Sequence, residues 1–226
     1  MKKINHLIIR GEIELLSGTR IGGSDDVLQI GGTDLTCIKD PATGRPYIPG
    51  SSIKGRMRSG LEKLLGKVAQ GKPCGCAGPA CPVCRIFGPH MKTQHDLGPT
   101  RIIIRDAQLL GDGTFSVENK TESVNNRATG AAQHPRTVER VATGARFSLE
   151  IAIQEFDIDS AFKYKDSNGQ ELVGGKALIE VVDHALFEME QTGIGAGTGK
   201  GYGQIKIHWS GQVDTAKRES RAKSFL

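Results

Sequence analysis

The chain has 226 residues, of which 37% are hydrophobic and 24% charged, so it can bury a sizeable core, most simply as one elaborated domain. No stretch approaches the roughly 20 apolar residues of a membrane-spanning helix, and the first residues lead into a strand-like pattern and not a signal peptide. We therefore expect a soluble, cytoplasmic protein with no membrane partner. The formal net charge of +5 favours an anionic partner weakly, while 5% aromatic residues argue against stacking bases on a ring-lined platform.

Strand-like and helix-like hydrophobic spacings alternate along the chain in the order β-α-β-β-α-β. This order predicts an α+β protein with a ferredoxin-like (RRM-like) core, in which two helices cover one face of an antiparallel sheet. In the first helix, Ser51 and Ser52 are the expected N-caps and Gly66 the expected stop, while Gly193 is expected to end the second. The strand-like segments are residues 4–16, 102–110, 147–153 and 204–209, and the helical segments are 53–65 and 178–189.

Three long insertions separate these elements. Residues 17–48 are rich in Gly and Asp, residues 66–100 in Cys, Pro, Gly and His, and residues 111–144 form a polar arm. Connections in compact domains usually have about 4 to 6 residues, so these insertions are expected to be functional. The domain is expected to span residues 1–213, followed by a charged tail at 214–226.

The second insertion carries a cysteine pattern typical of a zinc site. Its spacing, CxC-x4-CxxC, brings four soft ligands together through short turns, as a tetrahedral structural Zn²⁺ requires. The alternatives are a simple cluster of structural thiols or disulfides, which a reducing cytoplasm disfavours. Either His90 or His95 could replace one thiolate, and Cys37 stands apart as a buried thiol. The four cysteines of this cysteine loop, residues 74–84, are Cys74, Cys76, Cys81 and Cys84.

The start of the first predicted helix is strongly basic. Lys54, Arg56 and Arg58 follow a Pro-Gly-Ser-Ser entry that contains Ser51 and Ser52. A helix N-terminus has free N–H groups, and with adjacent cations it favours an anion such as a phosphate. The same pattern is also typical of a solvated helix face.

The glycine loop, residues 193–203, has glycine at every second position and one cation, Lys200. Such a segment allows another chain or a phosphate backbone to approach closely. A nucleotide-binding P-loop is excluded, because that motif needs glycine at Ile194 and Ser or Thr at Gly201. Together with the basic helix start, the glycine loop predicts a track for a nucleic-acid strand.

The first insertion contains four aspartates: Asp25, Asp26, Asp34 and Asp40. Carboxylates on such a loop are able to hold a divalent ion or to assist attack by a 2′-hydroxyl on its own phosphodiester. Aspartates in glycine-rich loops are also common turn formers, and spacing alone does not single one out.

Several segments taken together resemble a known family. They are residues 11–23, 30–34, 39–41, 47–58, 85–88 and 135–140 and the glycine loop. In these segments the chain is similar to the backbone RAMP subunits of type III-A CRISPR (Csm) effector complexes, and type III-D complexes contain closely similar subunits. The resemblance covers nearly the whole chain.

The resemblance implies a subunit that polymerises along CRISPR RNA, each copy covering six nucleotides, beside other Csm subunits. It implies a thumb hairpin at about 120–140 between guide and target, a structural zinc, and Asp34 as the catalytic residue for divalent-metal-dependent (Mg²⁺) cleavage of target RNA by the 2′-hydroxyl route. The residues expected to contact RNA are Arg20, Ser51, Ser52, Lys54, Arg56, Arg58, Arg127, Arg136, Gly197, Gly199 and Lys200.

Two hypotheses follow from the sequence. In the first the protein is a guide-bound endoribonuclease subunit, and in the second it is a structural RNA-binding backbone without its own nuclease activity. A more distant alternative is a guide-processing RAMP endonuclease, which would rely on histidines, but the six histidines are scattered along the chain.

Overall fold

The computed structural model describes residues 1–22, 35–68, 70–92, 94–111 and 117–210. Three of the four aspartates in the first insertion, Asp25, Asp26 and Asp34, lie outside these residues, as does the tail at 214–226. Among the described residues, no helix is long and apolar enough to cross a membrane.

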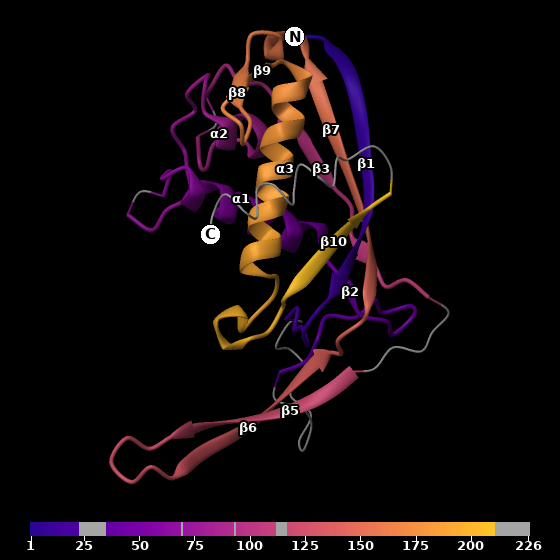
Figure 1. The fold of residues 1–226 in the computed structure, drawn as a ribbon, viewed down its shortest axis with the longest axis vertical. Helices are drawn as coiled ribbons and strands as arrows, with labels where there is room; N and C mark the ends of the chain where they lie inside the picture. The colour runs from indigo at the N-terminus through magenta and orange to yellow at the C-terminus, as the bar shows by residue number, and fades with distance from the viewer. Residues whose placement is uncertain (23–34, 69, 93, 112–116, 211–226) are drawn as a thin grey trace.

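The centre of the molecule is an antiparallel four-stranded sheet with the strand order β10-β1-β7-β3 (Figure 1). Ile13 of β1 lies opposite Ile207 of β10 on one side and Phe147 of β7 on the other. The strand-like segments of the sequence are confirmed, except that the one at 102–110 divides into two short strands. The strands are β1 (Lys3–Leu15), β3 (Ile102–Ile104), β4 (Ala107–Gln108), β7 (Arg146–Phe156) and β10 (Ile205–Trp209).

The sheet has one apolar and one polar face. Along β7, Leu149, Ile151 and Ile153 are buried, while Glu150 on the other face pairs with Arg10 at 2.9 Å. Side chains alternate between the two faces of a strand, so this pattern places the core on one side of the sheet. The structure is therefore a mixed α/β fold with a single main core.

Two long helices, α1 (Gly50–Leu64) and α3 (Gly175–Thr192), pack against each other beside the sheet (Figure 1). Their apolar residues recur at three and four positions, and each fully buried Leu, Ile or Met contributes about 1.5–3 kcal/mol relative to an exposed one. Both helices stop at the predicted glycines, because Gly66 and Gly193 adopt left-handed φ values of 61° and 74°. The fully buried side chains of the two helices include Ile53, Met57, Leu61, Leu178, Val181, Val182 and Ala185.

The predicted N-caps of α1 are wrong. The N-cap is Pro49, and Ser51 and Ser52 lie inside the first turn without a side-chain capping bond. The first free N–H of the helix, at Gly50, instead donates to Asp106 Oδ1 at 2.7 Å. The cap thus comes from the segment between β3 and β4, which local sequence spacing does not reveal.

The remaining elements lie in or near the insertions. A long hairpin, β5 (Val117–Asn125) with β6 (Ala132–Val141), projects from the body of the molecule (Figure 1). It occupies the position of the expected thumb. The cysteine loop leads into the short helix α2 (Pro82–Phe87), and β2 (Tyr47–Ile48) pairs with β4. A small hairpin of β8 (Lys163–Lys165) and β9 (Glu171–Val173) was not predicted, because its strands have three residues each.

Candidate RNA interface and metal centre

The four thiols of the cysteine loop converge on one point. The Sγ atom of Cys74 lies 3.6 Å from that of Cys76, 3.8 Å from that of Cys81 and 3.6 Å from that of Cys84. In a tetrahedral site with Zn–S bonds of about 2.3 Å, neighbouring sulfur atoms are about 3.8 Å apart. The arrangement therefore fits a structural Zn²⁺ bound by four cysteines.

Neither His90 nor His95 belongs to this cluster. Among the described residues, the only group of three or more potential metal ligands consists of the four cysteines. His90 is exposed and donates its backbone N–H to Cys74 O at 3.0 Å, while His95 Nδ1 accepts the N–H of Leu97. The histidine alternative left open by the sequence is thus not supported by the geometry.

Burial makes the ionised form of these thiols costly in the absence of a cation. It raises the pKa of the Cys81 thiol to about 11, since a thiolate is costly in a low-dielectric environment. A bound divalent cation would offset that cost and hold the cysteines deprotonated. An ion bound by all four cysteines would have no open position for water, as in structural and not catalytic zinc sites.

Helix α1 holds the first cysteine of the cluster, Cys74, by both of its backbone groups. Glu62 Oε1 accepts the N–H of Cys74 at 2.9 Å, and Arg58 donates to Cys74 O at 2.8 Å. Arg58 and Glu62 also pair with each other at 2.8 Å. Arg58, predicted to contact RNA, is therefore engaged in fixing the cysteine loop to α1.

A buried ion-pair network supports the other side of the cysteine loop. Arg101 and Asp159 are both fully buried and pair at 2.7 Å, and Arg85 of α2 joins Asp159 at 3.2 Å. Arg85 also donates to Pro79 O inside the cysteine loop at 2.7 Å. Sequence reasoning missed this network, because its three members lie in separate segments of the chain and no local pattern connects them.

The other basic residues of α1 differ in their surroundings. Arg56 donates through Nε to Gly193 O at 2.6 Å and through a second nitrogen to Thr192 O, at the end of α3. Lys54 is half-buried and makes no ion pair with the described residues. Burial, followed by the nearby charge of Arg58, lowers the pKa of its ammonium group. Of these three basic residues of α1, Lys54 is therefore the one whose ammonium group is available to bind an anion.

The glycine loop combines tight internal contacts with an open segment. At Gly195, which has φ of +83°, a Cβ atom would lie 2.4 Å from Arg20 O, so no larger residue fits. At Gly199 a Cβ atom would meet nothing within 4 Å. The first part of the loop is therefore packed against the protein, while the turn at Thr198–Lys200 faces outward.

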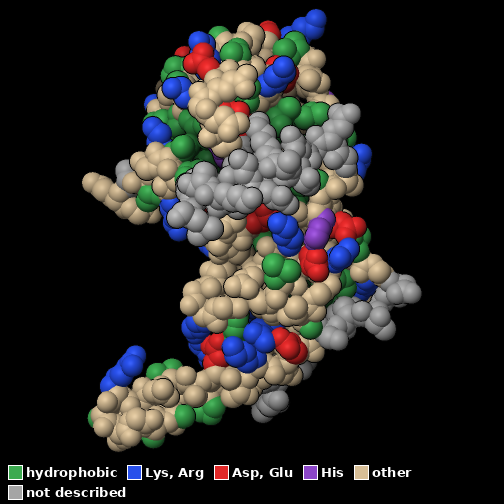
Figure 2. Space-filling view, in the orientation of Figure 1, with side chains coloured by type: hydrophobic (Ala, Val, Ile, Leu, Met, Phe, Trp, Pro, Cys, Tyr) green, Lys and Arg blue, Asp and Glu red, His purple; other side chains and the backbone are tan. Residues whose placement is uncertain are grey.

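Four of the predicted RNA-binding residues meet around one cavity of about 170 Å³ where the hairpin joins the body. They come from the first insertion (Arg20), β6 (Arg136) and the glycine loop (Gly197 and Lys200). Figure 2 shows basic and acidic side chains gathered where the projecting hairpin meets the rest of the molecule. The full lining is Arg20, Leu35, Glu122, Arg136, Val138, Ala196, Gly197, Lys200 and Tyr202.

Glu122 of β5 connects the hairpin to the glycine loop inside this cavity. Its carboxylate accepts hydrogen bonds from Tyr202 OH, from Arg136 at 3.0 Å and from Lys200 at 3.1 Å. These donors, Tyr202 first, lower the pKa of Glu122 to about 2. Glu122 was not recognised from the sequence, since an acidic residue is unexpected in an anion-binding cavity.

The ring of Tyr202 lies between two cations of the hairpin. Lys120 Nζ is 4.5 Å and the Arg140 guanidinium carbon 4.6 Å from the ring centroid. Cation–π contacts of this kind contribute about 0.5–2 kcal/mol each. Tyr202 therefore fixes the base of the hairpin with its ring as well as its hydroxyl.

The segment that carries Asp34 begins and ends beside the same cavity. Ala196 of the glycine loop donates to Arg20 O at 2.9 Å, and Ile38 donates to Ile21 O at 2.9 Å, which closes the neck of the segment. Leu35, the next residue after Asp34, lines the cavity, and its carbonyl accepts the N–H of Glu139 at 2.9 Å. The side chain of Asp34 itself lies outside the described residues.

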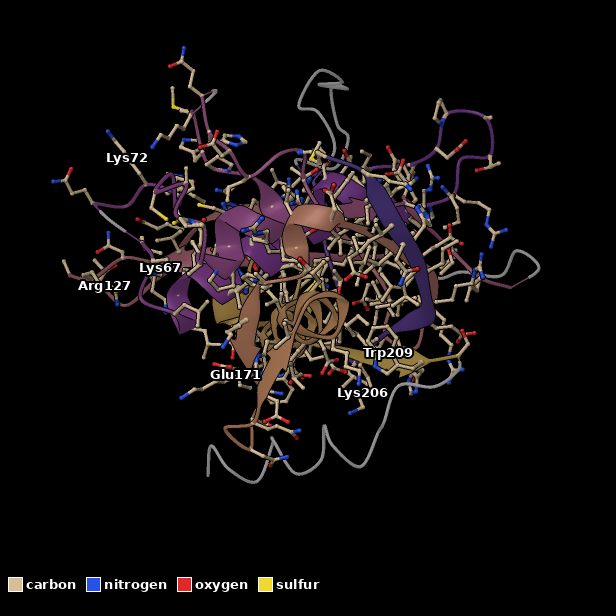
Figure 3. All side chains as sticks on the ribbon, turned by 90° about the horizontal axis from the view of Figure 1, so that it is seen from above. Lys67, Lys72, Arg127, Glu171, Lys206 and Trp209 are labelled. Atoms are coloured by element: carbon tan, nitrogen blue, oxygen red, sulfur yellow. The ribbon has the colours of Figure 1, made fainter. Side chains whose placement is uncertain are left out.

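The remaining predicted contacts are not brought to the cavity. Arg127 is exposed in the turn between β5 and β6, at the far end of the hairpin. Lys67 and Lys72, which precede the cysteine loop, lie on the same side of the molecule as Arg127 in the view from above (Figure 3). This side therefore presents several separated cations, which favour an anionic partner.

Comparisons with known proteins define the class. A model described as the RAMP superfamily matches residues 12–206, which is most of the chain. A crystal structure of a Csm3–Csm4 subcomplex of the type III-A CRISPR-Cas interference complex shares the fold, with a TM-score of 0.51 and 22% identity. It is matched over 100% of this chain and 98% of that chain.

Two curated relatives are similar enough to specify the family. The chain is 37% identical to "CRISPR system Cms endoribonuclease Csm3" of Methanothermobacter thermautotrophicus, covering 92% of this chain and 85% of the relative. It is 36% identical to the protein of the same name from Methanocaldococcus jannaschii, covering 89% and 78%. The chain belongs to the RAMP superfamily and, within it, to the family of Csm3 proteins.

Proposed function

We propose that this protein is the RNA-binding backbone subunit of a cytoplasmic type III CRISPR (Csm) complex and cleaves RNA complementary to the bound guide. The observation that carries this proposal is family membership, at 37% identity over most of the chain with a protein named as an endoribonuclease. Several copies would lie along the CRISPR RNA guide, in contact with one another and with other Csm subunits.

The core of the subunit is ferredoxin-like in this proposal. In that fold the first strand lies between the fourth and the third, and the second strand is at an edge. The order β10-β1-β7-β3, with α1 after the first of these strands and α3 before the last, supports the assignment.

Guide RNA would contact the protein around the cavity at the base of the hairpin. Arg20, Arg136 and Lys200 supply three positive charges there against the single carboxylate of Glu122, so the cavity is cationic. Lys54 would contribute a further phosphate contact, and Gly199 would allow the backbone of the RNA to approach closely. Contacts of this type hold phosphates and carry little sequence preference, as a subunit acting on many guides requires.

The target RNA would be cut beside Asp34. In the proposed step a 2′-hydroxyl loses its proton and attacks the adjacent phosphorus, and the bond to the 5′-oxygen breaks. The products are a 2′,3′-cyclic phosphate and a 5′-hydroxyl. Mg²⁺ would stabilise the charge on the phosphate. Among the described residues no carboxylate cluster is placed to hold Mg²⁺, so the cation requirement is a separate element of the proposal.

The test uses the assembled complex with a defined guide and a labelled complementary RNA. We expect cuts at six-nucleotide intervals in the presence of Mg²⁺ and loss of cutting by at least about 100-fold in Asp34→Ala, as for removal of a general acid–base group. Guide content and assembly should not change.

Asp40→Ala is the matched control for this experiment. Asp40 is an exposed turn former whose Oδ1 accepts the N–H groups of Ala42 and Thr43 at 2.8 and 3.0 Å, so its loss should leave cutting intact. If Asp34→Ala cut the target at the wild-type rate, the chain would be a structural backbone and the nuclease would be another subunit.

A further inference from the structure

The three basic residues at the start of α1 do not share one face of the helix. Residues two positions apart are separated by about 200° around a helix, whereas residues four apart lie on the same side. Lys54 and Arg58 therefore lie on one side of α1, and Arg56 lies on the opposite side. A single RNA strand that passes Lys54 does not meet Arg56 directly.

The side of α1 that carries Arg56 packs against α3. Gly60, four residues after Arg56, is buried, and a Cβ atom there would lie 3.0 Å from Glu188 Cβ of α3. From this interface the guanidinium of Arg56 reaches the end of α3, where it donates to Gly193 O at 2.6 Å and also to Thr192 O. The guanidinium is thus directed at protein backbone.

The carbonyl groups that Arg56 contacts are those that a helix end leaves without intrahelical partners. They carry a partial negative charge, and the planar guanidinium is able to serve two of them at once. Gly193 is also the first residue of the glycine loop, whose next residue, Ile194, donates to Gly203 O at 2.9 Å. Arg56 therefore fixes the point from which the glycine loop departs.

We propose that Arg56 is a positioning residue that holds the glycine loop in place for RNA, whereas Lys54 is the phosphate contact supplied by α1. This inference rests on the proposed RNA-binding function. It adds that two basic residues at the start of α1 have different roles. Loss of Lys54 removes a charge from the interface, while loss of Arg56 moves a loop that lies elsewhere in the interface.

The dependence of affinity on salt separates the two roles. Each phosphate contact on a single strand adds about 0.7 to the slope of log Kobs against log salt. With the full chain and a single-stranded guide RNA, Lys54→Ala should reduce this slope by about 0.7 per bound copy. Arg56→Ala should weaken binding about tenfold, comparable to one lost charge-assisted hydrogen bond, and leave the slope unchanged.

Arg56→Lys distinguishes geometry from charge. Lysine keeps the positive charge but presents a single nitrogen, which does not span both carbonyls, so this variant should bind as weakly as Arg56→Ala. Hydrogen exchange of the RNA-free protein provides an independent readout. The amides of Ile194 and Ala196 should exchange faster in both Arg56 variants than in wild type or Lys54→Ala.

Four outcomes would overturn the inference. A slope reduced by Arg56→Ala, or full affinity in Arg56→Lys, would make Arg56 a direct phosphate contact. Unchanged exchange at Ile194 and Ala196 in the Arg56 variants would remove its positioning role. Absence of salt-dependent RNA binding by the wild-type chain would instead overturn the proposed function itself, and the role of Arg56 with it.

Discussion

The cysteine loop and the glycine loop are both short segments with few large apolar side chains, yet they are fixed in different ways. In the cysteine loop four thiols that are close in sequence meet within 4.8 Å of one another. The glycine loop is held by partners far away in the chain, since Lys200 and Glu122 are separated by 78 residues and Arg56 and Gly193 by 137. The thiols that meet in the cysteine loop are therefore neighbours in sequence, whereas the side-chain contacts that hold the glycine loop come from distant elements of the fold.

The largest expected effect is removal of a metal ligand. Cys84→Ser should abolish metal binding and lower the melting temperature strongly, because structural zinc contributes about 10–16 kcal/mol of apparent binding energy in small zinc domains. Metal analysis and thermal unfolding of the purified protein measure both quantities.

Cys37→Ala is the control for this variant. Cys37 is also a buried cysteine, but it lies outside the cluster, so its loss should leave metal content unchanged. Wild-type protein that carries less than about half an equivalent of zinc would contradict the site, since structural zinc normally survives purification.

The next effect compares two glycines of the same loop. Gly195→Ala places a methyl group against Arg20 O and requires a residue other than glycine at φ of +83°, so we expect a loss of about 1–3 kcal/mol in the free energy of unfolding. Gly199→Ala enters open space and should change it by less than about 0.5 kcal/mol. Denaturant unfolding of both variants checks this difference. Equal effects would mean that the loop is not packed as described.

The smallest expected effect concerns Glu122, which joins the hairpin to the glycine loop. Its pKa is lowered to about 2 in the folded protein, so its contribution to stability is present above its ordinary pKa and is lost as the pH falls toward 2. Glu122→Gln should therefore cost about 1–2 kcal/mol at pH 7, after allowance for solvent screening.

The difference in the free energy of unfolding between wild type and Glu122→Gln should shrink as the pH falls from about 5 to about 2. Over that range the wild-type carboxyl group becomes protonated, first in the unfolded and then in the folded protein. Unfolding curves of the two proteins across that range measure it. A difference independent of pH would show that the carboxylate charge is not what holds the hairpin to the glycine loop.

Sequence reasoning succeeded where the determinants are local. The CxC-x4-CxxC spacing, the period of the helices, the alternation in β7 and the stops at Gly66 and Gly193 each depend on neighbouring residues. The family resemblance supplied the hairpin and its place in the chain.

Sequence reasoning failed where a distant side chain decides. Asp106 caps α1 in place of Ser51 and Ser52, and Glu122 neutralises part of the basic cavity. The protein partners of Arg56 and Arg58, which are the end of α3 and Cys74, were also not foreseen, while the RNA contacts predicted for the two residues stay predictions. Such pairings depend on which elements the fold brings together, and periodicity along one segment carries no information about them.

The exposure of the thiols adds a property that the ligand set alone does not imply. Cys76 is exposed, whereas Cys74, Cys81 and Cys84 are buried. Of the four thiols, that of Cys76 is thus the one most accessible to reagents from solution. A metal ion bound by the four cysteines would therefore have its single solvent-exposed ligand at Cys76, where we expect exchange with an ion such as Co²⁺ to begin.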